Sequence, residues 1–265
     1  EFQQLIDEEK ELQNKLLSLR DEPSVTTDGT AIRMLNNSGL LADLTPGLKY
    51  GAQGIGLYRT EIPFMVRQSF PSEQEQVEVY SEVFRIYAGM PVYMRTLDVG
   101  GDKQLPYFPI LDEENPALGW RGIRFTIDNI QLLMTQVRAM LQAAGTTGDL
   151  HILLPMVSAT EELNVFNELL GEALRQLQHE GIAVKRPRVG VMVEVPAAIS
   201  QLQFWRNRID FVSIGSNDLT QYLLALDRNN SRVASRYDPL HPAVIHELNR
   251  VVRIAREGDL ALSLC

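Results

Sequence analysis

The chain has 265 residues, of which 45% are apolar, and carries a formal net charge of −9. That length allows one large domain or two ordinary ones, and the negative charge argues against nucleic acid or an anionic membrane as a partner. The single cysteine, Cys265, excludes an intrachain disulfide. No apolar run approaches the ~20 residues of a membrane span. We therefore expect a protein of a reducing compartment, the cytoplasm.

The first segment is predicted to be a helical arm. Apolar residues recur at helical spacing between residues 2 and 20, and Pro23 ends the pattern because proline cannot continue a helix. We assign residues 1–29 to this arm and residues 30–265 to the main domain. The chain has no initiator Met and stops within an apolar run, so we expect a fragment of a longer protein.

From about residue 30, short apolar runs alternate with longer helical stretches. This alternation predicts a parallel sheet covered by helices on both faces. The fold class is therefore α/β, and seven strands fit a (β/α)8 barrel of the TIM type, truncated after strand 7. A doubly wound open sheet is the alternative, weakened because no glycine-rich phosphate fingerprint follows the first run. The predicted strands lie within residues 31–39, 54–60, 91–101, 151–157, 188–196, 211–216 and 260–265.

Two connections between the predicted strands carry more detail. Ser158 and Glu161 have the spacing of a capping box at the start of a helix, which Gly181 is expected to end. The stretch at 102–124 is rich in Pro and Gly and too long for a plain connection, so we expect it to form part of the site.

Polar residues gather where the predicted strands end. In a barrel, active-site groups come from the carboxyl ends of the strands. Arg59 and Arg95 end two neighbouring strands, and a buried arginine needs an anion to offset its desolvation. Asp98 could be a local partner of Arg95. Two such arginines nevertheless favour a shared anion, since guanidinium groups bind phosphate through two hydrogen bonds.

Two carboxylates at adjacent strand ends suggest a divalent cation. Glu194 lies within an apolar run, where an unpaired charge is costly, and Asp218 follows the next strand. Mg²⁺ prefers one or two carboxylates together with substrate oxygens and water. Asn217 could donate to an oxyanion. Cys265, also at a strand end, is either an ordinary free cysteine or a functional one.

Five stretches together resemble one known family. "GIGLYRTEIPFM", "RTLDVGGDKQLPY", "ENPALGWRGIR", "GVMVEVPAA" and "FVSIGSNDLTQYLLALDR" are similar to the phosphoenolpyruvate-utilising enzymes, above all to the barrel of the bacterial phosphoenolpyruvate-protein phosphotransferases, enzyme I. The resemblance covers nearly the whole chain from about residue 30. The stretch "NNSGLLADL" favours the nitrogen-branch form.

The resemblance implies a role for each matching residue. It makes Glu194 and Asp218 ligands of Mg²⁺ and Cys265 the catalytic cysteine. It gives substrate-binding roles to six residues. One of them, Arg228, would be an ordinary surface charge by the sequence pattern alone. These residues are Arg59, Arg95, Arg121, Asn217, Asp218 and Arg228.

The implied reaction is transfer of a phosphoryl group from phosphoenolpyruvate to a His on a separate domain, and on to a histidine-phosphocarrier protein, with release of pyruvate. The full-length protein is expected to be a homodimer, and the fragment to be inactive by itself. Two alternatives stay open. One is the barrel of a pyruvate phosphate dikinase or phosphoenolpyruvate synthase, and the other is a non-catalytic dimerisation or regulatory barrel.

Overall fold

The computed structural model describes residues 2–101, 103, 105–108 and 113–265. Seven parallel strands form one sheet in which each strand pairs with the next along the chain. A doubly wound sheet would reverse its strand order part-way, so the sequential order confirms the barrel-type topology. The strands are β1 (Asn36–Ser38), β2 (Ile55–Arg59), β3 (Pro91–Arg95), β4 (Asp149–Leu154), β5 (Arg188–Val193), β6 (Phe211–Ile214) and β7 (Ala261–Leu264).

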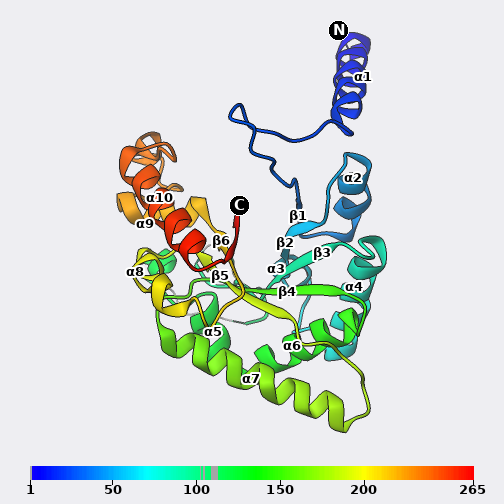
Figure 1. The fold of residues 1–265 in the computed structure, drawn as a ribbon, viewed down its shortest axis with the longest axis vertical. Coiled ribbons are helices and arrows are strands. Elements are labelled where there is room, and N and C mark those ends of the chain that lie inside the picture. The colour runs from blue at the N-terminus through cyan, green and yellow to red at the C-terminus, as the bar shows by residue number, and fades with distance from the viewer. Residues whose placement is uncertain (1, 102, 104, 109–112) are drawn as a thin grey trace.

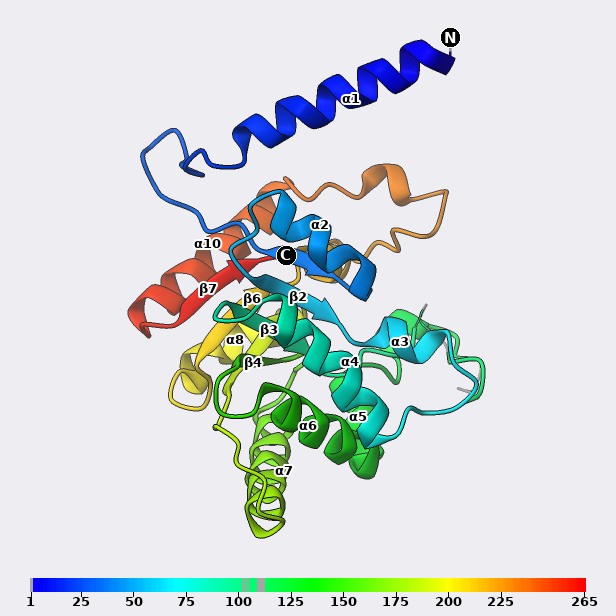
Figure 2. The ribbon, with the colours of Figure 1, turned by 90° about the vertical axis from the view of Figure 1, so that its right-hand side faces the viewer.

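Helices surround the curled sheet, and one helix stands apart from it. The helix α1 (Phe2–Leu19) projects away from the body in both views (Figures 1 and 2). None of the helices in the described residues is long and apolar enough to cross a bilayer. The others are α2 (Leu44–Lys49), α3 (Glu61–Met65), α4 (Glu73–Ile86), α5 (Ile123–Asp128), α6 (Ile130–Ala144), α7 (Thr160–His179), α8 (Pro196–Trp205), α9 (Ser216–Leu224) and α10 (Pro242–Glu257).

Alternation along the strands divides the core into two parts. In β4, the side chains of Ile152 and Leu154 join the large cluster that packs against the helices. Leu153, between them, joins a smaller cluster with Leu57 and Met192. Successive side chains of a strand point to opposite faces, so the smaller cluster fills the inside of the curled sheet. Because both faces of the sheet are buried, nearly every residue along a strand such as β5 is apolar.

Curvature brings the first and last strands of the sheet close together. The side-chain nitrogen Nδ2 of Asn37, in β1, lies 3.3 Å from the Sγ atom of Cys265, which follows β7. The carboxyl terminus lies near β1 in Figure 1. The sheet is therefore a strongly curled half-barrel and not an open, flat layer.

The structure corrects two local expectations. The predicted run 91–101 is a strand only to Arg95, and Gly100, with φ of 104°, turns the chain away from the sheet. At the start of α7 the capping acid is Glu162, and the prediction of Glu161 is wrong. Glu162 accepts the backbone N–H groups of Ser158 and Ala159 at 2.6 and 2.8 Å. The helix begins one residue later than expected, and the acid at its third position shifts with it.

Candidate active site

The carboxyl ends of the strands bring the predicted residues to one rim. Arg59 and Arg95 are register partners at the ends of β2 and β3. Further along the sheet, Val193, Ile214 and Leu264 are aligned in the same way. The residues that follow these three therefore start from the same level of the barrel, because parallel strands keep their register. They include Glu194 and Cys265, which were expected to act together.

Arg95 is buried among carboxylates. Its Nη2 atom lies 2.5 Å from Oε1 of Glu61 and 3.2 Å from Oδ2 of Asp98. Lys103 reaches the same two acids, at 3.1 and 2.7 Å. The local Arg95–Asp98 pair left open from the sequence thus exists, but as part of a larger network. Buried charges of this kind persist only where each has partners of opposite sign.

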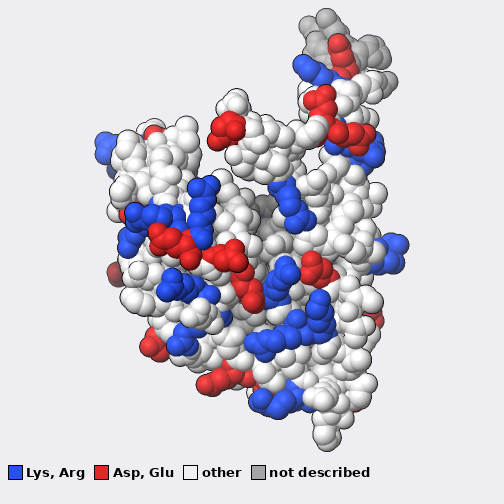
Figure 3. All heavy atoms as spheres, in the orientation of Figure 1, with Lys and Arg blue, Asp and Glu red and all other residues white. Residues whose placement is uncertain are grey.

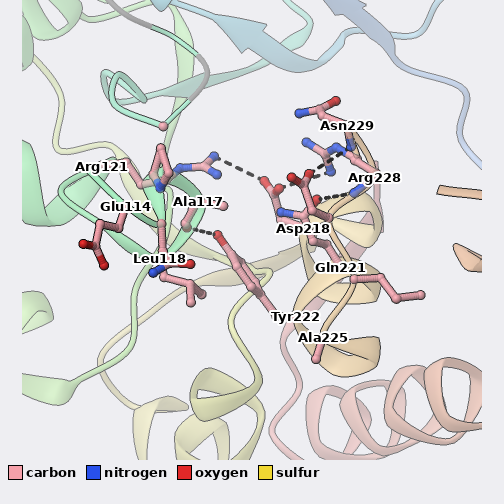
Figure 4. Close-up of a pocket in the computed structure, with 15 residues that line it drawn as sticks. Glu114, Ala117, Leu118, Arg121, Asp218, Gln221, Tyr222, Ala225, Arg228 and Asn229 are labelled. Carbon is pink, nitrogen blue, oxygen red and sulfur yellow. Dashed lines mark hydrogen bonds and ion pairs between the residues drawn. The ribbon is translucent and has the colours of Figure 1, made fainter. Parts of the chain in front are cut away.

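A second group of charges joins the loop after β3 to helix α9. Figure 4 shows Arg121 and Arg228 on opposite sides of Asp218. The Nη2 atom of Arg121 lies 3.3 Å from Asp218 Oδ2 and 3.3 Å from Asp98 Oδ2, so Arg121 links the two groups. Arg228 Nη1 lies 3.1 Å from Asp218 Oδ1. The chain returns Arg228 to this point because Ala225 ends α9 in the left-handed conformation, with φ of 51°.

The carboxylate of Glu194 is fixed by a backbone hydrogen bond and occupies space left free by a glycine. Its Oε1 atom accepts the N–H of Met156 at 2.6 Å. Met156 has φ of 60°, a strained conformation for a non-glycine residue that is typical of functional sites. A Cβ atom on Gly215 would lie 2.7 Å from Oε2 of Glu194, so the glycine after β6 makes room for the carboxylate.

Burial and neighbouring charges shift the pKa values of the buried acids in opposite directions. Burial raises the pKa of Glu194, and the negative charges of Asp98 and Asp218 raise it further. Burial also acts to raise the pKa of Asp98, but Arg95, Arg121 and other cations outweigh it and hold that pKa below its usual value. Two acids at one rim thus differ in protonation tendency, which is a common property of catalytic sites.

Cys265 lies within reach of the same charges. The residue is exposed overall, but partial burial of its thiol raises the pKa, and Glu194 adds to this effect. Arg95, Arg59 and the hydrogen bond from Asn37 act in the opposite direction. The thiol is therefore protonated at neutral pH and can serve as a proton donor.

Asn217 does not join the cluster in this structure. Its side chain is exposed, and the hydroxyl of Tyr237 donates to its backbone oxygen at 3.0 Å and lies 3.4 Å from its side-chain oxygen. Its predicted role toward the substrate stays a prediction. Of the other predicted residues, Arg121, Asp218 and Arg228 are in direct contact, and Arg95 joins them through Asp98. Glu194 and Cys265 lie within electrostatic reach of Arg95, and Arg59 is its register partner.

A pocket of about 540 Å³ opens beside Asp218. Its polar wall carries Arg121 and Arg228, and its apolar wall carries Leu118 and Tyr222 (Figure 4). The hydroxyl of Tyr222 donates to the backbone oxygen of Ala117, which fixes the loop after β3 against α9. On the face drawn in Figure 3, Lys and Arg side chains lie next to Asp and Glu side chains.

The donor set can be tested for a metal ion. Within the described residues there is no group of three or more His, Cys, Asp or Glu side chains that could hold one. Glu194 and Asp218 are nevertheless both hard oxygen donors, and Oδ1 of Asp218 accepts no hydrogen bond of good geometry within the described residues, although Arg228 Nη1 lies 3.1 Å away. A two-carboxylate site fits Mg²⁺, which takes its remaining ligands from substrate and water.

Several residues of this network carry no obvious signal in the sequence. Glu61 and Lys103 were part of quoted motifs but had no predicted role. Gln136, on α6, is also buried, and its side chain donates to Thr60 at 3.1 Å and accepts the N–H of Leu97 at 2.8 Å. A glutamine at an otherwise apolar helix face was the available signal for it.

Comparison with known proteins decides the family. Residues 13–265 match the family model described as the PEP-binding domain of PEP-utilising enzymes. The chain belongs to the PEP-utilising enzyme family. It is 48% and 47% identical, over its full length, to proteins of Salmonella typhimurium and Escherichia coli named phosphoenolpyruvate-dependent phosphotransferase system. It spans 35% of the length of each. A phosphoenolpyruvate-protein phosphotransferase of Haloferax volcanii is 42% identical over 94% of the chain and 45% of that protein.

Two solved structures of distantly related sequence share the fold of this PEP-utilising family member. A citrate lyase of Burkholderia xenovorans matches 89% of the chain and 64% of its own with a TM-score of 0.54 at 15% identity. A HpcH/HpaI aldolase/citrate lyase family protein of Burkholderia cenocepacia matches 95% of the chain and 83% of its own with a TM-score of 0.53 at 12% identity. At such identities the likeness shows the α/β barrel-type fold alone.

Proposed function

We propose that this chain is the phosphoenolpyruvate- and Mg²⁺-binding domain of a phosphoenolpyruvate-protein phosphotransferase. The observation that carries the proposal is the charge cluster at the strand ends. Five basic side chains face four acids there, which leaves one excess positive charge. A divalent cation together with the phosphoenolpyruvate trianion would neutralise it. The basic residues are Arg59, Arg95, Lys103, Arg121 and Arg228, and the acids are Glu61, Asp98, Glu194 and Asp218.

The chemistry of phosphoryl transfer suits such a cluster. The transition state is loose and highly anionic, so catalysis consists mainly of positioning and charge stabilisation. The Nε atoms of Arg59 and Arg95 are buried and make no hydrogen bond within the described part of the chain, which leaves them free to donate to a phosphate. Arg121 and Arg228 would add to the stabilisation from the side of α9.

The protein's own residues would handle charge and protons as follows. The phosphorus–oxygen bond of phosphoenolpyruvate breaks as a bond to an imidazole nitrogen of a separate His forms, and the departing oxygen keeps the electron pair as an enolate. The Cys265 thiol then gives its proton to the methylene carbon, which yields pyruvate, and the thiolate regains a proton from water. Glu194 and Asp218 would hold Mg²⁺, which supplies Lewis-acid stabilisation of the substrate oxygens when bound.

The partners belong to the same proposal. The relatives named as phosphotransferases support a histidine-phosphocarrier protein as acceptor, and we propose a cytoplasmic homodimer for the full-length protein. We propose that the acceptor His lies on a separate domain, since the five stretches that carry the family resemblance contain none of the four histidines, His151, His179, His241 and His246. The assignment to the nitrogen branch, the arm at 1–29 and the barrel at 30–265 also stay proposals.

Calorimetric titration tests the proposal. Phosphoenolpyruvate added to the chain in the presence of Mg²⁺ should give a binding isotherm that is lost on omission of the metal and in the Glu194→Gln variant. A flat titration, repeated on a chain extended beyond Cys265, would favour the non-catalytic alternative. Detection of phosphohistidine on the 1–265 chain incubated with phosphoenolpyruvate would contradict the separate acceptor domain.

A further inference from the structure

Glu61 is a buried acid to which neither the motifs nor the proposed reaction gives a role. It is the first residue of α3, follows the β2 end within the stretch "YRTE", and is 1% exposed. Its Oε1 atom contacts both Nη2 of Arg95, at 2.5 Å, and Nζ of Lys103, at 3.1 Å. Its Oε2 atom is buried without a hydrogen bond in the described part of the chain.

The contact between Glu61 and Arg95 involves a single nitrogen. A guanidinium has five N–H donors, and an arginine–carboxylate pair built for strength is usually bidentate. Here Nη2 of Arg95 binds both Glu61 and Asp98. Among the described residues, Nη1 contacts only the sulfur of Met192, at 3.7 Å, and Nε makes no hydrogen bond. Both acids therefore bind Nη2, and the N–H donors of Nε and Nη1 have no oxygen acceptor within the described residues.

Arg95 belongs to the same rim as Glu194 and Cys265. Arg95 interacts electrostatically with Glu194, and Arg95 and Arg59 both act on the thiol of Cys265. Arg59 is also the register partner of Arg95 in the neighbouring strand. A phosphate lying between the two arginines could accept a hydrogen bond from the free Nε–H of Arg95 without any rotation of the side chain.

Other contacts already hold the strand ends that Glu61 connects. Thr60 donates its hydroxyl to the backbone oxygen of Arg95 at 2.8 Å, and Gln136 donates to the same hydroxyl. These hydrogen bonds hold the ends of β2 and β3 together without a contribution from Glu61. Because a buried ion pair contributes little net stability, the pair is better explained by orientation of the guanidinium.

We propose that Glu61 is a positioning residue that holds Arg95 by Nη2, so that the N–H donors of Nε and Nη1 stay available to the phosphate of the substrate. The inference rests on the proposed function for the identity of the anion. The orientation itself does not depend on any ligand. Glu61 would thus act through Arg95 and would not touch the reacting atoms.

Two measurements on Glu61→Gln test the idea. The first is the Nε–Hε signal of Arg95 in NMR spectra of the chain without ligand, assigned by its loss in Arg95→Lys. We expect this signal to shift and to exchange with solvent faster in Glu61→Gln. The matched control is Glu73→Gln, which breaks an equivalent carboxylate–arginine contact, 2.8 Å from Arg138 Nε, far from the rim. An Arg95 signal that is unchanged in Glu61→Gln would overturn the proposal.

The second measurement compares two ligands in the presence of Mg²⁺. Glu61→Gln should lower the affinity for phosphoenolpyruvate at least tenfold and leave the affinity for oxalate, which has no phosphate, unchanged. In an Arg95→Met background the same substitution should have no further effect. Equal losses for both ligands, or additive effects, would show a structural role only. If Glu61→Gln does not fold, Glu61→Asp replaces it, with a smaller expected loss and the same ligand pattern. If the wild-type chain binds neither ligand, the proposed function fails, and the NMR measurement still decides on Glu61.

Discussion

The guanidinium of Arg121 lies 3.3 Å from the carboxylate of Asp218, although 97 residues separate them in the chain. The same group reaches Asp98, so Arg121 connects the charges after β3 with those of α9. Asp218, Asp98 and Arg228 belong to this group of contacts directly, and Arg95 and Lys103 are linked to it through Asp98. Removal of this one cation should therefore affect ligand binding more than it affects the fold.

Arg121→Met is expected to weaken phosphoenolpyruvate binding by about 100-fold, the usual effect of losing one charged donor at such a site. Asp218 keeps Arg228 as a partner, so the variant should still fold. Calorimetric titration in the presence of Mg²⁺ measures the change. Arg175→Met, which removes an exposed ion pair on α7, is the control and should bind as the wild type does. Equal binding by Arg121→Met would exclude this residue from the site.

Glu194 should make the stability of the chain depend on pH. Burial, followed by Asp98 and Asp218, raises its pKa from 4.5 to about 8. A carboxyl group whose pKa is raised by folding favours the folded state fully below its unfolded pKa and loses this contribution as the pH rises through the folded pKa. Without metal, its stabilising effect should thus decline between about pH 4.5 and pH 8.

Urea unfolding at several pH values checks this expectation. The wild-type chain should lose stability relative to Glu194→Gln as the pH rises through this window, because the amide does not ionise. Mg²⁺ should bind more tightly over the same window, since a carboxylate ligand must release its proton first. Parallel stability curves for the two proteins would contradict the raised pKa of Glu194.

Gly215→Ala should displace the Glu194 carboxylate. The new Cβ atom would lie 2.7 Å from Oε2 and 2.9 Å from Cβ of Glu194, closer than such atoms can approach. We expect loss of phosphoenolpyruvate binding and a destabilisation of about 1–3 kcal/mol from overpacking. Gly171→Ala is the opposite control, because this position lies within α7 with room for a methyl group. It should stabilise the chain by about 0.5–1 kcal/mol. A Gly215→Ala chain that binds normally would show that the carboxylate can move aside.

The start of α7 offers a test away from the site. Glu162→Ala removes the acceptor of two backbone N–H groups and should cost about 1 kcal/mol of unfolding free energy, as the loss of a helix cap does. Glu161→Ala, one residue earlier and exposed, should leave stability unchanged. Thermal or urea unfolding compares the two. A larger effect at Glu161 would restore the original prediction from sequence spacing.

The sequence by itself determined the order of the elements and the positions of most site residues. Apolar runs are long because parallel strands are buried on both faces, and the charged residues Arg95 and Glu194 stand where β3 and β5 end. Parallel strands in register end at the same rim of the barrel. The site residues that end or follow these strands could therefore be expected to lie close together. The alternation of apolar runs with helical stretches predicted the α/β class, because a parallel sheet needs helices to connect its strands and cover its faces.

Only the tertiary structure decided which charges are partners. Glu61, Lys103 and Arg121 contact acids or bases from other elements, and no local spacing encodes such distances. The left-handed backbone of Met156 and the exposed position of Asn217 likewise depend on how neighbouring loops pack. Pairing between buried charges is set by the packing of the whole barrel, because desolvation makes each group depend on whichever opposite charge the fold brings within reach.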